Sequence, residues 1–213
     1  MESHVRGGTR WKRFAVVMVP SVAATAAIGV ALAQGALAAS FSVSGQEFKV
    51  TADTLHGDGF VQYGNVDVEH NGTPHAVAVS AFTDATIHGL CQSVVVPTPI
   101  GDVTLKLTAG NNGKVVTAKN LYIDLDQLDA DATFNDINIG VAAGNTDSSY
   151  AHVEDQVGKD EKNGGAASFA QEAKSADLVG VKQTAWATSA GTFKLAGLSL
   201  RLHKGSGPGV ECY

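Results

Sequence analysis

The chain has 213 residues, of which 44% are hydrophobic and only 17% are charged. The apolar fraction excludes a disordered chain, and the low charged fraction argues against a helical bundle, which would be richer in Leu, Glu and Lys. After Ala33 the sequence holds 20 acidic and 11 basic residues. Nucleic acid is therefore not an expected partner, and a simple attraction to anionic lipid is not expected either.

Residues 1–38 have the pattern of an export segment. The stretch from Phe14 to Val30 is almost entirely apolar, follows four basic residues and precedes two small-x-small triplets of the kind that signal peptidase cuts after. Because the apolar stretch approaches the roughly 20 residues that span a bilayer, the predicted N-terminal helix is either a cleaved signal peptide or a retained membrane anchor. Residues 39–213 are then an exported domain, secreted or associated with the cell envelope or membrane.

The first part of this domain alternates apolar and polar residues with the period of a β-strand. Residues 41–44 and 48–52 are predicted to form a strand pair joined at Gly45. Asn71-Gly72 predicts a hairpin, because both residues tolerate the positive φ of a type I′ turn. The segment Gly110-Asn-Asn-Gly113 predicts a second hairpin between alternating strands.

An eight-residue pattern occurs twice, as Ala85–Gln92 and Ala176–Gln183, which indicates an internal structural repeat. Both copies read Ala, any residue, Ile or Leu, any residue, Gly, Leu or Val, any residue, Gln. A β-bulge at the central glycine would turn the next apolar residue and the glutamine inward. The buried glutamines are expected to bond to neighbouring strand backbones, a structural and not a catalytic role. The four positions concerned are Gly89, Gln92, Gly180 and Gln183.

A polar, charged stretch near residues 143–165 predicts an exposed insertion loop. Residues 166–176 could form a short helix on propensity alone. Their correspondence to residues 76–85, upstream of the first repeat copy, favours extended structure instead. Further strands are predicted up to Leu202, before a glycine-rich tail.

The chain contains two cysteines, Cys91 and Cys212. An even count in an exported domain predicts a disulfide, which would tie the C-terminus to the middle of the sheet. Closing so long a loop would contribute about 4–5 kcal/mol in the chain-entropy model. The alternative is a reactive thiol, which is the weaker interpretation because exported thiols rarely stay reduced.

Few residues indicate chemistry. Asp124 and Asp126 are weak candidates for a metal site, because one face of a strand could present both carboxylates to a hard cation such as calcium. The alternative is a solvated strand face, since no calcium-loop motif is present. His70 and His75 bracket the Asn-Gly turn without a third zinc ligand. The sequence has no Gly-x-Ser-x-Gly elbow and no phosphate-binding glycine loop, so we predict no catalytic residue and no cofactor.

Six blocks of the chain carry a resemblance to known sequences. These blocks are Gly59–Gly64, Leu90–Val95, Pro97–Gly101, Ile123–Leu128, Gln183–Phe193 and Glu211–Tyr213. Together they resemble an uncharacterised family of actinobacterial exported or membrane-associated proteins whose members often carry the label "cholesterol esterase". The resemblance covers nearly the whole chain, and the run Gln-Thr-Ala-Trp-Ala-Thr is its most specific part. It implies an exported envelope protein, and its label implies a lipid-ester hydrolase, without implying catalytic residues.

We therefore expect a mainly β domain, built as an antiparallel sandwich or a partly closed barrel. A β-solenoid is the alternative, because residues 81–87, 118–123 and 132–139 look like successive rungs. The expected function is that of a non-enzymatic exported cell-envelope protein that presents a lipid-binding or interaction surface. The alternatives are a lipid-ester hydrolase and a structural protein that associates with itself. Lipid and other envelope proteins are the expected partners.

Overall fold

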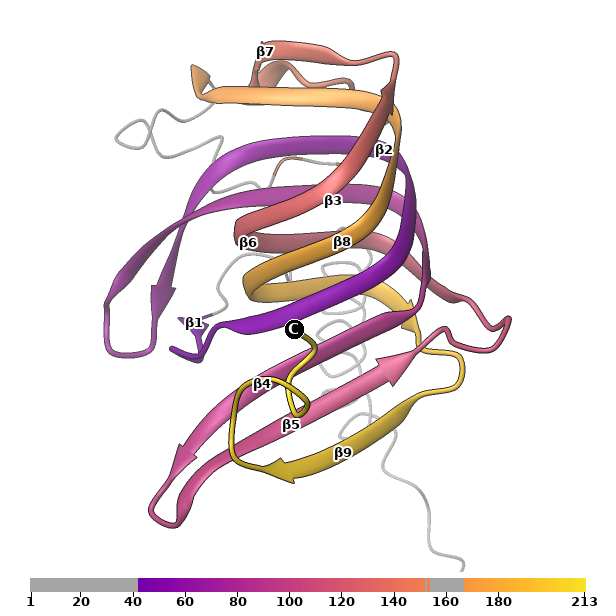
Figure 1. The fold of residues 1–213 in the computed structure, drawn as a ribbon. Coiled ribbons are helices and arrows are strands. Elements are labelled where there is room, and N and C mark those ends of the chain that lie inside the picture. Colours follow the sequence, from indigo (N-terminus) through magenta and orange to yellow (C-terminus); the bar gives the residue numbers. More distant parts are fainter. Residues whose placement is uncertain (1–41, 152, 154–166) are drawn as a thin grey trace, which may run out of the picture. The chain divides into compact units, whose positions relative to one another are not determined.

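The computed structural model describes residues 42–151, 153 and 167–213 (Figure 1). The chain divides after Ala38, and all described residues belong to the unit Ala39–Tyr213. The predicted signal or anchor helix at residues 1–38 lies outside the described residues, as does most of the predicted insertion loop. In the part of the chain that is described, no helix is both long enough and apolar enough to cross a membrane.

Strands make up most of the described chain, and the short 3₁₀ helix η1 (Ala143–Asn145) interrupts them. The prediction of a mainly β fold is confirmed. The stretch after residue 166 is extended, as predicted, and not helical. The strands are β1 (Ser42–Val43), β2 (Phe48–Glu69), β3 (Pro74–His88), β4 (Leu90–Thr98), β5 (Gly101–Ala109), β6 (Val116–Asn135), β7 (Asn138–Ala142), β8 (Phe169–Lys194) and β9 (Ser199–Lys204).

All nine described strands belong to one sheet, rather than to the two stacked sheets of a sandwich. Their order is β7-β8-β6-β3-β2-β4-β5-β9, with β1 beside β2 and an additional pairing between β8 and β2. Because of that additional pairing, β2, β3, β6 and β8 form a closed circuit, which we call the ring. β4 pairs with the first residues of β2 and continues through β5 to β9 as an open extension, which we call the wing (Figure 1).

The pairings within the described sheet are antiparallel, apart from that of β1 with β2, which confirms the antiparallel prediction and corrects three others. The solenoid alternative is wrong, because residues 81–87 and 118–123 run antiparallel in β3 and β6. β1 pairs with the distant end of β2 and not across Gly45. Residues 110–113 connect β5 to β6, which do not pair, so the second hairpin is wrong. The hairpin at Asn71-Gly72 is confirmed, but the predicted type I′ turn is wrong, because Gly72 has a positive φ and Asn71 does not.

The two copies of the repeated pattern lie on opposite edges of β2. Each β2 residue faces the same position of both copies, because the registers of the β2–β3, β2–β4 and β2–β8 pairings coincide. Gly57 lies opposite Ala85 and Ala176, Leu55 opposite Ile87 and Leu178, Thr51 opposite Cys91 and Lys182, and Val50 opposite Gln92 and Gln183. β2 is therefore the common partner around which the two copies are arranged.

Both central glycines have a positive φ, +63° at Gly89 and +66° at Gly180. The apolar residues on either side of each glycine point into the ring: Ile87 and Leu90 in the first copy, Leu178 and Val181 in the second. β2 also changes which of its faces points to the core at this level, because Ala52 and Leu55, three residues apart, are both buried in the same core. A strand that alternated strictly would expose one residue of each pair.

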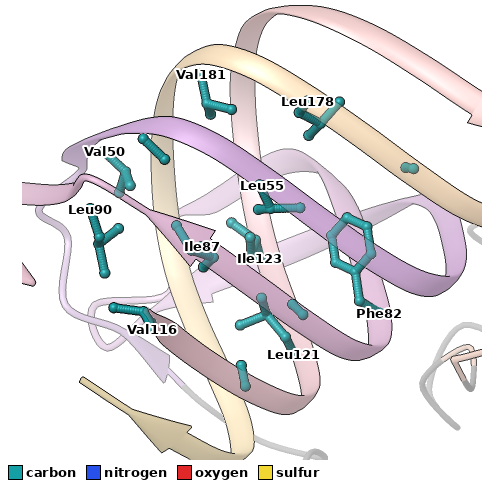
Figure 2. Packing of buried hydrophobic residues seen from close by; sticks show 14 of the residues in the cluster. Val50, Leu55, Phe82, Ile87, Leu90, Val116, Leu121, Ile123, Leu178 and Val181 are labelled. Carbon is teal, nitrogen blue, oxygen red and sulfur yellow. The ribbon is translucent and has the colours of Figure 1, made fainter. Parts of the chain in front are cut away.

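The ring interior is filled by aliphatic and aromatic side chains from all four of its strands (Figure 2). Large residues come from β3 and β6, where Phe82 and Leu121 are almost completely buried. Small residues come mainly from β8, including Ala173 and Ala176. This pairing of large with small residues lets strands cross a narrow core without leaving large voids.

A second, smaller core lies on the outer side of the same strands, around Val61, Tyr63 and Val79. The chain after β7 covers it: Ala143 and Ala151 are buried there, and the Ala151 amide donates to the carbonyl of Gly59. The first part of the predicted exposed loop is therefore packed against the ring, because its alanines complete an apolar cluster. Residues 154–165 of that loop lie outside the described residues.

Candidate functional site

The wing has one face that is almost entirely aliphatic. Side chains of adjacent strands line up in three rows across β4, β5 and β9, because cross-strand partners in a sheet share a face. The rows are Gln92–Leu107–Leu200, Val94–Leu105–Leu202 and Val96–Val103–Lys204. Gln92 lies at the end next to the ring and Lys204 at the outer end. We call the other seven residues the apolar face of the wing.

This face is open to solvent, most of all on β9. Leu200 is 57% exposed and Leu202 is 71% exposed. Nearby, Leu198 before β9 and Ile100 at the β4–β5 turn are also exposed. A contiguous patch of exposed aliphatic residues is uncommon on a monomeric domain, and such patches mark interaction sites.

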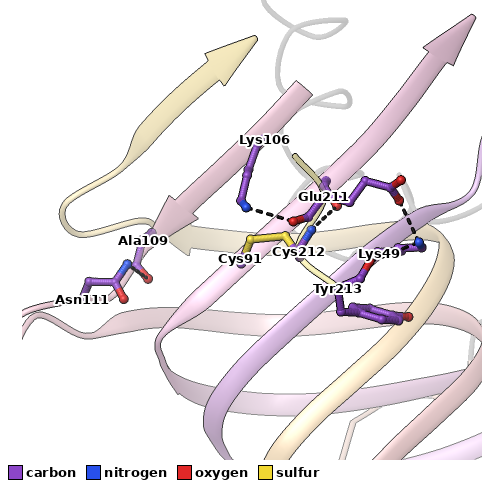
Figure 3. The surroundings of a disulfide bond; sticks show 9 residues. Lys49, Cys91, Lys106, Ala109, Asn111, Glu211, Cys212 and Tyr213 are labelled. Atoms are coloured by element: carbon purple, nitrogen blue, oxygen red, sulfur yellow. Dashed lines mark hydrogen bonds and ion pairs between the residues drawn. A yellow bond between two sulfur atoms is a disulfide. The ribbon is translucent and has the colours of Figure 1, made fainter. Parts of the chain in front are cut away.

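The opposite face of the wing is covered by the C-terminal tail, residues 205–213 (Figure 3). The predicted disulfide is present: the Sγ atoms of Cys91 and Cys212 are 2.03 Å apart. The Cys212 amide donates to Ser93 Oγ, and Lys106 Nζ donates to the carbonyl oxygen of Glu211, at 3.0 and 2.9 Å. The tail therefore occupies one face of the wing and leaves the apolar face uncovered.

Glu211 anchors the tail to the ring. Its carboxylate lies 2.7 Å from Lys49 Nζ on β2, and its side chain is almost fully buried. The backbone amide of Gly207 donates to the same carboxylate. The hydrogen bond from Lys49 is the main cause that lowers the pKa of Glu211, against a smaller opposite effect of burial.

Charge is distributed unevenly between the ring and the wing. Among described residues, the wing with its connections, 90–115 and 194–213, has five basic side chains and two acidic ones. The remainder of the described domain has fourteen acidic side chains and four basic ones. The basic residues of the wing are Lys106, Lys114, Lys194, Arg201 and Lys204. The net negative charge of the chain thus hides a net positive wing. Lys204 lies at the outer end of the apolar face, whereas Lys106 and Arg201 share a row with Ser93 on the face that the tail covers.

A cavity of about 30 Å³ lies where the wing meets the ring. The two repeated glutamines line it together, among aliphatic residues that include Val50, Leu90 and Val181. Gln183 is only 5% exposed. A second cavity of about 20 Å³ lies deeper in the ring and shares Gln183 with the first. Neither is large enough to enclose a lipid, since pockets for organic ligands measure roughly 300–1,000 Å³.

Asp124 and Asp126, the weak candidates for a metal site, lie in different surroundings. Asp126 is exposed beside an irregularity in β6, whereas the half-buried Asp124 hydrogen-bonds to Asp67 of β2. Burial is the main cause that raises the pKa of Asp67, opposed by the bond to Asp124 and by the charge of His75. In the described part of the chain, no three metal-ligating side chains are grouped to hold an ion.

Histidines form carboxylate pairs on the ring. His56 Nδ1 lies 2.7 Å from Asp177 Oδ1, and His75 Nε2 lies 2.6 Å from Glu69 Oε1. The ring of His75 also stacks on Trp186, with centroids 3.8 Å apart. Within the described residues, no serine hydroxyl is hydrogen-bonded to a histidine, so the histidines offer no assembled nucleophile–base pair of the kind used in ester hydrolysis.

Sequence reasoning missed the most exposed part of the candidate surface, Leu200, Leu202 and Lys204. The run Ser199-Leu-Arg-Leu-His-Lys204 alternates like any half-buried strand, and nothing in it shows that its apolar side is uncovered. One signal was present in the sequence: the last alternating strand carries basic residues, although the rest of the domain is acidic.

The fold and this surface define a disulfide-closed antiparallel β domain with an open apolar face. The chain belongs to DUF6230, a family of unknown function whose model matches residues 44–213. No curated protein and no solved structure matches the chain.

Proposed function

We propose that the protein is a non-enzymatic module of the cell envelope that attaches to an anionic lipid surface through the apolar face of the wing. The observation that carries the proposal is the set of cross-strand rows on β4, β5 and β9, with Leu200 and Leu202 largely exposed. In this proposal the leader exports the domain. The Cys91–Cys212 disulfide is compatible with an oxidising compartment.

Charge favours a lipid surface over a second copy as the occupant of this face. Two wings that each carry a net positive charge would repel one another, whereas anionic headgroups would attract a wing, most directly through Lys204 at the outer end of the apolar face. The acidic ring would be repelled by the same headgroups. The domain would therefore approach a bilayer with the wing first.

The expected attachment is weak and reversible. Burying one exposed leucine completely contributes about 1.5–3 kcal/mol, and each basic residue near an anionic surface contributes about 1 kcal/mol. Leu200 and Leu202 together with Lys204 supply enough for a peripheral contact, but not for permanent insertion.

Hydrogen exchange of the full chain with vesicles tests the proposal and reports on each strand separately, whatever the leader does. We expect vesicles of equal parts phosphatidylcholine and phosphatidylglycerol to slow exchange in peptides that cover β5 and β9. Leu202→Glu should abolish this protection. The matched control is Ile139→Glu on β7, because Ile139 is 68% exposed, close to the value for Leu202, and lies at the other end of the strand order.

Three results would contradict this function. Equal protection by pure phosphatidylcholine would remove the role of charge. Protection that grows with protein concentration in the absence of vesicles would indicate self-association through the wing. Turnover of a lipid ester that one substitution abolishes would establish the hydrolase instead.

A further inference from the structure

The cavity at the inner end of the apolar face has polar groups that the wing does not need. We propose that it binds the hydroxyl end of an uncharged amphiphile, an aliphatic primary alcohol, through the side-chain amides of Gln92 and Gln183. The inference deepens the proposed function, because it assumes that the aliphatic chain of the ligand lies along the apolar face. The hydroxyl recognition itself follows from a separate observation.

That observation is the state of Gln183. The residue is only 5% exposed, and it lines both cavities. No hydrogen bond joins its amide to any residue in the described part of the protein, and the same holds for Gln92. The expected bonds to strand backbones are therefore not formed. Both glutamines line the cavity without a protein partner for their amides, so a small polar group that enters the cavity can bond to them.

The two amides converge because of the repeat. Gln92 on β4 and Gln183 on β8 lie on either side of Val50 of β2, which faces both of them. The bends at Gly89 and Gly180 turn both glutamines toward the cavity, where they are the amide side chains of the lining. Two amides together offer both donors and acceptors to a single small group.

The lining determines the class of ligand. Among the residues that the structure describes, no charged side chain lines the cavity, so the burial of an ionised head would be unfavourable. A hydroxyl can donate to one amide carbonyl and accept from the other amide nitrogen. A volume of about 30 Å³ suits a hydroxyl and its first methylene, since one water needs about 10–15 Å³ on the same scale.

The rest of such a ligand has a route out of the cavity. Thr188 and Phe193 line the cavity and are themselves exposed, so they form its rim. Gln92 belongs to the first cross-strand row of the wing, beside Leu107 and Leu200. An aliphatic chain that leaves the cavity past Gln92 would therefore continue along the apolar face.

The test uses 1-hexanol as the probe and needs no vesicles. In NMR spectra of the full chain, 1-hexanol should shift the side-chain amide signals of Gln92 and Gln183 in a saturable way. The amide of Gln62 should not shift, because it is already bonded to Ser80 and Gln171. Hexanoate, which has the same chain with a charged head, should leave all three signals unchanged. Gln183→Met should abolish the response at Gln92.

Thermal stability gives a second readout that does not depend on the probe. Gln183→Met should raise Tm, because it removes an amide that lacks a partner, whereas Gln62→Met should lower Tm, because it breaks two hydrogen bonds. The absence of a saturable shift, together with a long-lived water at the Gln183 amide, would overturn the proposal and leave a buried water only. An equal response to hexanoate would overturn it as well. Either result leaves the vesicle experiment untouched, so the two proposals can fail separately.

Discussion

The two copies of the repeat begin alike and end in different parts of the molecule. Both flank β2 in the same register, both bend at a glycine with positive φ, and both direct a glutamine into the same cavity. After that point the second copy continues within β8 and closes the ring. The first copy passes into β4 and leaves the ring as the first strand of the wing.

The difference shows how one local pattern serves two purposes. Two residues after the bend, the first copy has Cys91 and the second has Lys182, and both face Thr51 of β2. Lys182 is exposed, whereas Cys91 is joined to the tail that covers one side of the wing. The ring is stabilised by closure around a core, and the wing by a covalent link at its base. That arrangement leaves the aliphatic side of the wing available for binding.

Removal of the disulfide should have the largest effect and should affect the wing more than the ring. Cys212→Ser opens a loop whose ends are 121 residues apart, and the chain-entropy model assigns about 4–5 kcal/mol to a loop of this length. We expect the free energy of unfolding in urea to fall by up to that amount. Limited proteolysis should cut the released tail before it cuts the ring.

The control for this prediction is Cys91→Ser, which opens the same link from the other side and should give the same loss. Both cysteines should resist alkylation in the wild-type protein until a reductant is added. Alkylation of either cysteine without reduction would contradict the disulfide.

The next largest effect is expected when each of the two central glycines is replaced by alanine, and it should differ between the two copies. Both sites have positive φ, so both Gly89→Ala and Gly180→Ala should lose about 1–2 kcal/mol. A Cβ at Gly89 would also collide with the carboxylate of Asp53, whereas a Cβ at Gly180 would meet no atom within 4 Å. Because the exposed Asp53 side chain can move aside by a change of rotamer, we expect Gly89→Ala to lose only about 0.5–1.5 kcal/mol more, as measured by urea unfolding.

A double variant isolates the collision. Asp53→Ala in the Gly89→Ala background should recover most of the extra loss, and in the Gly180→Ala background it should recover none. Equal losses of unfolding free energy for Gly89→Ala and Gly180→Ala would contradict the predicted effect of the contact with Asp53.

The sequence was sufficient to predict the β class, the disulfide and the change of side at both glycines. These features depend on local alternation, on the number of cysteines and on the special conformations that glycine adopts. The ring could not be predicted in the same way. Strands as long as β2 and β8 read as several short ones, because each change of side interrupts the alternation that defines a strand.

The candidate surface was harder to predict for a related reason. An alternating strand such as β9 shows which residues share a side, but its neighbours decide whether that side is covered. The pairing of β5 with both β4 and β9 joins residues around positions 94, 105 and 202 into one row, and sequence distance conceals this. The opposite charges of ring and wing were likewise hidden in one net value for the whole chain.

The smallest predicted effects come from two acids, one in each region, whose pKa values shift in opposite directions. The pKa of Glu211 at the wing is lowered, so its charged form stabilises the fold; this contribution is present above about pH 4.3 and is lost as pH falls through the folded pKa. The pKa of Asp67 in the ring is raised, so its charged form opposes folding at neutral pH, and this cost disappears below about pH 3.9.

At pH 7, Glu211→Gln should therefore lose about 1–2 kcal/mol of unfolding free energy through its weakened bond to Lys49, whereas Asp67→Asn should gain a smaller amount. Urea unfolding from pH 7 to pH 3 should bring both variants toward the wild type, Glu211→Gln from below and Asp67→Asn from above. Exposed Asp126→Asn should follow the wild type throughout, and a loss of stability in Asp67→Asn at pH 7 would mean that its charged form supports the ring after all.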